Sequence, residues 1–155
     1  MKQRKSLELY PLTMCYFIKR TQKCTKLFIN HYYMSNKISV ITVVFNDVTH
    51  IRATMESFFS QTWEDKEYIV IDGGSTDGTA EIIKEYADRL AYWCSEKDGG
   101  IYDAMNKGIV HATGDWINIL NCGDYYCSED SLRNAIIKSS NNKDADIIYG
   151  NSITI

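Results

Sequence analysis

Five short apolar segments, separated by stretches with helical periodicity, dominate the sequence after residue 37. The segments are residues 38–45, 68–71, 90–94, 116–120 and 146–150. The first is β-branched and almost continuously apolar, which is typical of a strand buried on both faces. Apolar residues recur at helical spacing near 48–61, 82–87, 101–112 and 132–136. This alternation predicts an α/β fold in three layers (αβα), with a mostly parallel sheet between helices.

Composition narrows the class of protein further. The 155 residues suit a single domain, and the net charge of −3 gives no electrostatic case for a nucleic-acid partner. The five cysteines form no CxxC pair, which favours free thiols in a reducing compartment. No apolar run reaches the roughly 18 residues that a membrane-spanning helix needs. We therefore expect a cytoplasmic protein.

The N-terminal stretch, residues 1–36, differs from the rest of the chain. Residues 1–37 carry eight Lys or Arg and one acidic residue, whereas residues 38–155 carry nine basic and nineteen acidic residues. Aromatic residues are scattered among the lysines without helix or strand periodicity. We predict a basic, poorly ordered extension, or an arm that binds the inner face of a membrane or an acceptor. Alternatively, Met34 is the natural start, and residues 1–33 come from an over-extended reading frame.

Polar and glycine-rich turns follow four of the predicted strands. They contain Phe45 and Asn46, residues 72–79, residues 96–100 and residues 121–124. Ligands of open parallel sheets bind beyond the carboxyl ends of the strands, so these turns indicate a nucleotide-type site. Residues 73–78 match neither GxGxxG nor a phosphate-binding P-loop. The alternative for this turn is a strand-to-helix connection that Thr76 or Asp77 caps.

The turn after the fourth predicted strand is a candidate metal site. It reads Asn121-Cys-Gly-Asp124 and follows the apolar residues 116–120. A carboxylate at the end of a buried strand can hold Mg²⁺ or Mn²⁺, which share their oxygen ligands with substrate phosphates. The alternative is a simple Asx turn.

Four motifs in this order resemble family 2 glycosyltransferases. They are Ile38-Ser-Val-Ile-Thr-Val-Val-Phe-Asn46, Glu67-Tyr-Ile-Val-Ile-Asp-Gly-Gly-Ser-Thr-Asp-Gly-Thr79, Asp98-Gly-Gly-Ile-Tyr-Asp-Ala-Met-Asn-Lys-Gly108 with the following residues 112–117, and Leu120-Asn-Cys-Gly-Asp124. The resemblance covers roughly residues 38–150. It implies a GT-A fold and residues 37–155 as the donor-binding portion of a glycosyltransferase domain.

The resemblance also implies roles for individual residues. The donor is a nucleotide-diphosphate sugar, and a divalent metal at Asp124 bridges its diphosphate. Phe45 stacks near the base and Asp72 forms a hydrogen bond with it. The donor-binding residues implied are Phe45, Asn46, Asp72, Gly74, Asp98, Asp103, Asn106 and Asn121. The sugar is transferred to an acceptor hydroxyl of a polysaccharide, another glycan or a lipid-linked acceptor, which fits a site on a membrane surface.

The chain departs from the family pattern in two ways. Asn121 and Gly123 stand where the family often has acidic residues, which predicts weaker metal binding. The family's general base and acceptor half lie beyond the metal motif, so we expect a fold that is incomplete at the C-terminus. The alternatives are a non-catalytic nucleotide-sugar-binding fragment, whose partner supplies the acceptor half, and a product that folds poorly. Poor folding would follow if the strand at 146–150 lacks a neighbour and leaves an open edge.

Overall fold

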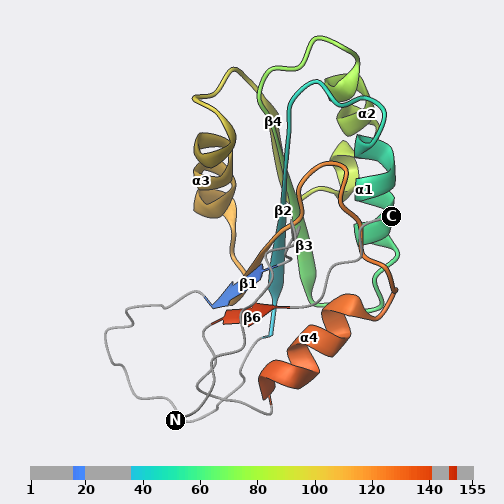
Figure 1. Ribbon diagram of the computed structural model, residues 1–155, viewed down its shortest axis with the longest axis vertical. Coiled ribbons are helices and arrows are strands. Elements are labelled where there is room, and N and C mark those ends of the chain that lie inside the picture. The colour runs from blue at the N-terminus through green and yellow to red at the C-terminus, as the bar shows by residue number, and fades with distance from the viewer. Residues whose placement is uncertain (1–15, 20–35, 141–146, 150–155) are drawn as a thin grey trace, which may run out of the picture.

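A computed structural model describes residues 16–19, 36–140 and 147–149 of the chain. These residues form a six-stranded sheet in the order β4-β3-β2-β5-β1-β6, with helices packed against it (Figure 1). The elements are β1 (Tyr16–Lys19), β2 (Ile38–Val44), α1 (Ile51–Phe59), β3 (Lys66–Asp72), α2 (Thr79–Glu85), a 3-10 turn (Ala87–Arg89), β4 (Tyr92–Ser95), α3 (Ile101–His111), β5 (Trp116–Ile119), α4 (Ser131–Ser140) and β6 (Ile147–Tyr149). The strands and helices predicted after residue 37 are confirmed, with ends that differ by a few residues.

The pairing of the strands makes the sheet mostly parallel, as predicted. β2 lies at the centre and pairs in parallel with β3 and β5, and β3 pairs in parallel with β4. β1 is antiparallel to both of its neighbours, β5 and β6. The carboxyl ends of β2, β3, β4 and β5 therefore lie along one edge of the sheet.

Alternate residues of β2 enter two separate cores, which gives the three layers. Ile38, Val40 and Val44 pack with apolar residues of α1, α2 and α4. Ile41 and Val43 point to the opposite face and pack with α3. Because both faces are covered, the strand needs apolar residues at odd and even positions alike. Figure 1 shows α3 on one side of the strands and α1 and α2 on the other.

β1 is a strand that the sequence pattern did not predict. It lies between β5 and β6, and Ile18 pairs with Ile117 on one side and Ile147 on the other. Four residues are too few to show a reliable alternation, and pairing with distant strands defines this element. The poor-folding alternative assumed a last strand without a neighbour, but β6 pairs with β1. Residues 1–15 and 20–35 lie outside the described part, so the basic extension and the start at Met34 stay predictions.

A bilayer-spanning helix is not found among the described residues. None of their helices combines the length and apolar character that crossing a membrane requires.

A hydrogen-bonded carboxylate ties three elements together at the opposite, amino edge of the sheet. Glu67 accepts hydrogen bonds from the Ser39 hydroxyl at 2.6 Å and from the backbone N–H of Thr113 at 2.6 Å. It also accepts one from the Thr113 hydroxyl at 2.7 Å and pairs with the Lys37 ammonium at 2.7 Å. Burial raises the pKa of Glu67, but these bonds outweigh burial and lower the pKa to about 2.

Glu67→Gln is expected to reduce the dependence of the free energy of unfolding on pH below pH 4.5. The pKa of Glu67 in the folded chain lies below its usual value of 4.5, so its contribution to stability is present above pH 4.5. That contribution is lost as the pH falls from 4.5 towards 2. Urea unfolding at a series of pH values should show that the variant takes up one proton fewer on unfolding across this interval. The same pH dependence in both proteins would contradict the assignment.

Candidate functional site

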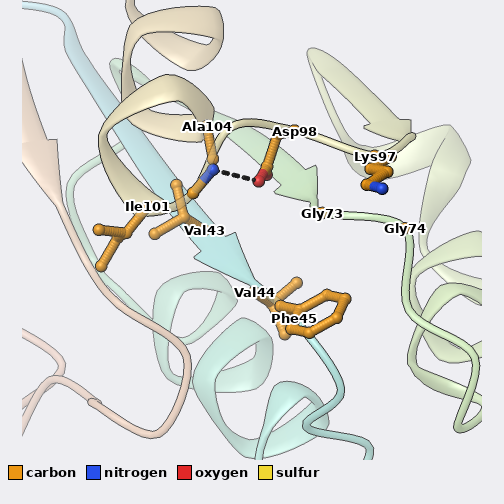
Figure 2. Close-up of a pocket in the computed structure, with 10 residues that line it drawn as sticks. Val43, Val44, Phe45, Gly73, Gly74, Lys97, Asp98, Ile101 and Ala104 are labelled. Atoms are coloured by element: carbon orange, nitrogen blue, oxygen red, sulfur yellow. Dashed lines mark hydrogen bonds between the residues drawn. The ribbon is translucent and has the colours of Figure 1, made fainter.

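A cavity of about 520 Å³ opens at the carboxyl edge of the sheet (Figure 2). It lies between the end of β2, the turn after β3 and the loop that leads into α3. Its lining residues are Val43, Val44, Phe45, Gly73, Gly74, Lys97, Asp98, Gly100, Ile101 and Ala104. The predicted site residues that the structure brings together in this cavity are therefore Phe45, Gly74 and Asp98.

An exposed aromatic ring and a carboxylate border the same space in the cavity. The Phe45 side chain is 63% exposed, although it directly follows a fully buried strand. A Cβ placed on Gly73 would lie 2.9 Å from Asp98 Oδ2 and 3.4 Å from Phe45 Cδ2. Asp98 is held in place because its Oδ1 accepts a hydrogen bond from the Gly100 N–H at 2.8 Å. Figure 2 shows Asp98 across the cavity from Phe45.

Gly74 lets two loops approach each other closely. Its φ is +84°, a conformation that glycine adopts without strain. A Cβ at this position would lie 3.1 Å from the backbone nitrogen of Lys97. The turn after β3 therefore supports the loop after β4, and that loop carries Lys97 and Asp98 into the cavity.

Asp72 does not line the cavity. It is fully buried, and its carboxylate accepts a hydrogen bond from the Ser75 N–H at 3.0 Å. The hydroxyls of Ser75 and Ser95 also donate to it. Asp72 thus joins the turn after β3 to the end of β4. In this arrangement its oxygens are engaged within the protein, and contact with a base stays a prediction.

Asn46 connects the loop after β2 to the turn after β3. It has a positive φ of 50°, and its side-chain oxygen accepts a hydrogen bond from the Thr76 N–H at 2.9 Å. Its own N–H donates to the Ser75 hydroxyl at 2.7 Å. Asp77 strengthens this connection, because it accepts hydrogen bonds from the N–H groups of Val48 and Thr79, each at 3.0 Å. The side chain of Asn46 therefore faces the neighbouring turn.

Two other predicted donor-binding residues lie on α3 outside the cavity lining. Asp103 accepts a hydrogen bond from the Gly99 N–H at 3.0 Å and lies 3.7 Å from the ammonium of Lys107. It thereby fixes the loop at the start of α3. Asn106 is exposed one turn further along the helix.

The candidate metal turn lies beside the cavity. The Cys122 N–H donates to the carbonyl oxygen of Val43 at 3.2 Å, and Val43 itself lines the cavity. The Gly123 N–H donates to the Thr54 hydroxyl at 3.0 Å, which fixes the turn on α1. Burial raises the pKa of Asp124, and a hydrogen bond from Asn121 partly opposes this rise.

The oxygens of this turn fit a hard divalent cation. Asn121 Oδ1 is buried and has no hydrogen-bond partner in the described structure. An amide oxygen beside a carboxylate is a ligand set that Mg²⁺ and Mn²⁺ accept. Among the described residues, no three His, Cys, Asp or Glu side chains gather to hold a metal by themselves. A cation at Asn121 and Asp124 would therefore need further oxygens from a ligand or from water.

Burial and a neighbouring carboxylate disfavour the thiolate form of the cysteine inside this turn. Burial raises the pKa of Cys122 to about 12, and the nearby Asp47 carboxylate adds to the effect. Its Sγ lies 3.4 Å from Asp47 Oδ2. The group therefore stays a neutral thiol at physiological pH. Cys94, Cys122 and Cys127 are free thiols, whereas Cys15 and Cys24 lie outside the described residues.

Two residues that line the cavity were not among the predicted donor-binding residues. They are Lys97, which brings a charged side chain, and Gly73, which leaves space. Lys97 stands next to Asp98 in a loop, and nothing in its immediate sequence distinguishes it from an ordinary surface lysine. Gly73 belongs to the quoted glycine turn, but its role depends on Asp98, which lies 25 positions later.

Comparison with known proteins places the chain in a family. The model of the family described as "Glycosyl transferase family 2" matches residues 39–155, and the chain belongs to this family. An uncharacterized glycosyltransferase of Mycobacterium tuberculosis is 42% identical over 100 residues, which cover 64% of this chain and 38% of that protein. A PGL/p-HBAD biosynthesis glycosyltransferase of Mycobacterium bovis is 33% identical over 118 residues, or 74% of this chain and 46% of that protein. The chain spans less than half the length of these relatives.

Solved structures share the fold, which is that of GT-A glycosyltransferases. The mannosyltransferase PcManGT of Pyrobaculum calidifontis, in complex with GDP-Man and Mn²⁺, superimposes with a TM-score of 0.60 at 27% identity. That match covers 64% of this chain and 31% of the other. Staphylococcus aureus TarS 1–349 in complex with UDP-GlcNAc gives a TM-score of 0.62 at 24% identity, over 69% and 32% of the two chains. The predicted GT-A fold is confirmed.

Proposed function

We propose that this chain binds a nucleotide-diphosphate sugar and forms the donor-binding portion of a glycosyltransferase. The observation that carries the proposal is the juxtaposition of the Phe45 ring and the Asp98 carboxylate in a cavity of about 520 Å³. A flat aromatic base stacks on an exposed ring, and a carboxylate accepts hydrogen bonds from its N–H groups. The GDP-Man complex of PcManGT supports this class of ligand.

The diphosphate is proposed to lie over the turn after β5. Asp124 and Asn121 would hold Mg²⁺ or Mn²⁺, which neutralises the charge of the diphosphate when bound. This arrangement agrees with the backbone bond that fixes Cys122 beside Val43. The Mn²⁺ in the PcManGT complex supports the metal assignment.

The reaction is proposed to be transfer of the sugar to an acceptor hydroxyl of a glycan or of a lipid-linked glycan. This transfer needs a base that takes the proton of the hydroxyl. Asp98 is the one carboxylate that lines the described cavity, and its Oδ1 is already bonded to Gly100. This favours the second candidate, a nucleotide-sugar-binding portion whose acceptor half and base come from elsewhere. Membrane association stays a prediction from the basic N-terminal residues.

Calorimetric titration of the full chain with UDP and with GDP in the presence of Mn²⁺ tests the proposal. We expect saturable binding of at least one of them. If neither nucleotide binds, the proposed function is wrong.

Phe45→Ala is expected to weaken nucleotide binding by about 5- to 150-fold, because stacking of a base on an aromatic side chain contributes roughly 1–3 kcal/mol. The control is Tyr102→Ala, which removes an aromatic side chain that is 79% exposed on α3 and does not line the cavity. The measurement is the same titration. Equal affinities of the two variants would show that the base does not stack on Phe45.

A further inference from the structure

A stripe of polar residues runs along the face of α1 that packs against the segment after β5. We propose that Thr54, the first residue of this stripe, is a positioning residue that holds the candidate metal turn, residues 121–124, in the conformation that binds a divalent cation. The inference rests on the proposed function, because it concerns the cation assigned there to Asn121 and Asp124. It adds a residue of α1 that lies outside the turn itself.

The polar stripe consists of Thr54 and Ser57 on α1 and Gln61 just after its end. These residues are three and four positions apart, so they lie on one side of the helix. Thr54 is 1% exposed and Gln61 is 4% exposed. Because buried polar groups need hydrogen-bond partners, this side of the helix cannot pack against apolar side chains alone.

All three side chains of the stripe bind the segment that connects β5 to α4. Figure 1 shows this segment, in orange, passing beside α1. The bonds run from the Gly123 N–H to the Thr54 hydroxyl at 3.0 Å, from the Tyr126 N–H to the Ser57 hydroxyl at 3.4 Å, and from Gln61 Nε2 to the Ser128 carbonyl oxygen at 2.8 Å. Of these three bonds, the one to Thr54 reaches into the candidate metal turn.

The candidate metal turn is a type II β-turn that brings its two end residues together. The Asp124 N–H donates to the carbonyl oxygen of Asn121 at 3.0 Å, which closes the turn. Gly123 has a φ of +93°, and Asn46 is the only described non-glycine residue with a positive φ, so the φ of Cys122 is negative. A negative φ followed by a positive φ is typical of a type II turn. The side chains of Asn121 and Asp124 meet in this turn, because Asn121 forms a hydrogen bond with the Asp124 carboxylate.

The bond to Thr54 determines which way the central peptide of this turn points. Turns of types I and II differ mainly by a rotation of the peptide between the second and third residues, and the Gly123 N–H belongs to that peptide. Glycine accepts both conformations, so the sequence of the turn does not itself select type II. Because Thr54 is closed off from water, a flipped peptide would lose this bond without a water molecule to replace it. Thr54 thus keeps Asp124 in one arrangement.

Titration of the full chain with Mn²⁺ in the presence of UDP, and in parallel of GDP, tests this inference. Electron paramagnetic resonance of the free ion gives the affinity for Mn²⁺. Thr54→Val replaces the hydroxyl by a methyl group and should weaken Mn²⁺ binding by about tenfold or more, since groups that orient metal ligands typically contribute about 10- to 100-fold. Thr54→Ser keeps the hydroxyl and should bind Mn²⁺ like the wild type.

The matched control is Gln61→Leu, which acts on the other end of the same segment. It removes the hydrogen bonds to the Ser128 carbonyl oxygen and from the Leu132 N–H, and it leaves the bond between Thr54 and Gly123 in place. We expect Gln61→Leu to be less stable in urea unfolding but to bind Mn²⁺ like the wild type. The comparison therefore separates the position of the turn from the stability of the chain.

Hydrogen exchange of the wild type gives a second measurement that needs no variant. The Gly123 amide hydrogen should be protected from exchange with or without Mn²⁺, because its acceptor is the buried Thr54 hydroxyl. Fast exchange of this amide would overturn the inference.

The remaining contrary results have distinct meanings. Mn²⁺ binding by Thr54→Val at the affinity of the wild type would overturn the inference and leave the proposed function intact. An equal loss in Thr54→Val and Gln61→Leu would also overturn it, because the affinity for Mn²⁺ would then follow the stability of the whole segment. If the wild type binds nucleotide without any dependence on Mn²⁺, the metal assignment in the proposed function fails and this inference fails with it.

Discussion

Asp124→Ala should abolish the metal-dependent part of nucleotide binding. Asp124 supplies the only carboxylate of the candidate metal turn, and the other oxygen there is the uncharged Asn121 Oδ1. Loss of groups that merely orient metal ligands already costs 10- to 100-fold in affinity, so we expect the loss of this carboxylate to cost at least about 100-fold. Titration of UDP or GDP with and without Mn²⁺ measures this difference.

The control for this prediction is Asp88→Ala, which removes the same charge from an exposed position in the 3-10 turn after α2. We expect it to retain the full Mn²⁺ dependence of the wild type. If Asp124→Ala also retains that dependence, the metal lies elsewhere and the assignment of this turn is wrong.

Gly114→Ala should lower the free energy of unfolding by about 2–3 kcal/mol, at the upper end of what overpacking costs. A Cβ at this position would lie 2.7 Å from the carbonyl oxygen of Lys37 and 2.8 Å from the backbone nitrogen of Ser39. Backbone atoms cannot move aside as a flexible side chain can. The Gly114 N–H also donates to the Ser39 hydroxyl at 2.8 Å, and a shift would disturb that bond. Urea unfolding monitored by circular dichroism gives the change.

Gly99→Ala is the matched control for stability. Its Cβ would meet Asp103 Cβ at 3.6 Å, an ordinary contact, and its φ is not in the left-handed region. We expect the free energy of unfolding to change by less than about 1 kcal/mol. Similar losses in both variants would contradict the steric explanation for Gly114.

Much of the fold could be predicted because most strands and helices have a recognisable apolar pattern within their own residues. The apolar run of β2 and the helical spacing of Ile101, Met105 and Ile109 in α3 depend on local sequence alone. β1 has no such signal, because four residues cannot establish a period and its partners lie about 100 positions away. Strands that are defined only by distant pairing escape this kind of reasoning.

The place of the candidate site agrees with the position of the cavity, but the contacts of individual side chains could not be predicted. The rule that ligands bind at the carboxyl ends of parallel strands pointed to the edge at which the cavity opens. Whether an aspartate there faces the cavity depends on contacts between loops. Asp72 is bonded to Ser75 and Ser95, whereas Asp98 reaches the space above Gly73. These contacts join residues that are distant in sequence, and no local pattern specifies them.

The position of β1 has a consequence for the order in which the sheet can assemble. Contacts between segments close in sequence form faster than contacts that close long loops. β2, β3 and β4 follow one another along the chain and pair side by side, so the half of the sheet beneath Phe45 and Asp98 can form early. β6 joins the sheet through β1 alone among the described strands, and Ile18 must find Ile147, about 130 residues away. We infer that the far edge of the sheet closes last, after the half of the sheet that carries Phe45 and Asp98 has formed.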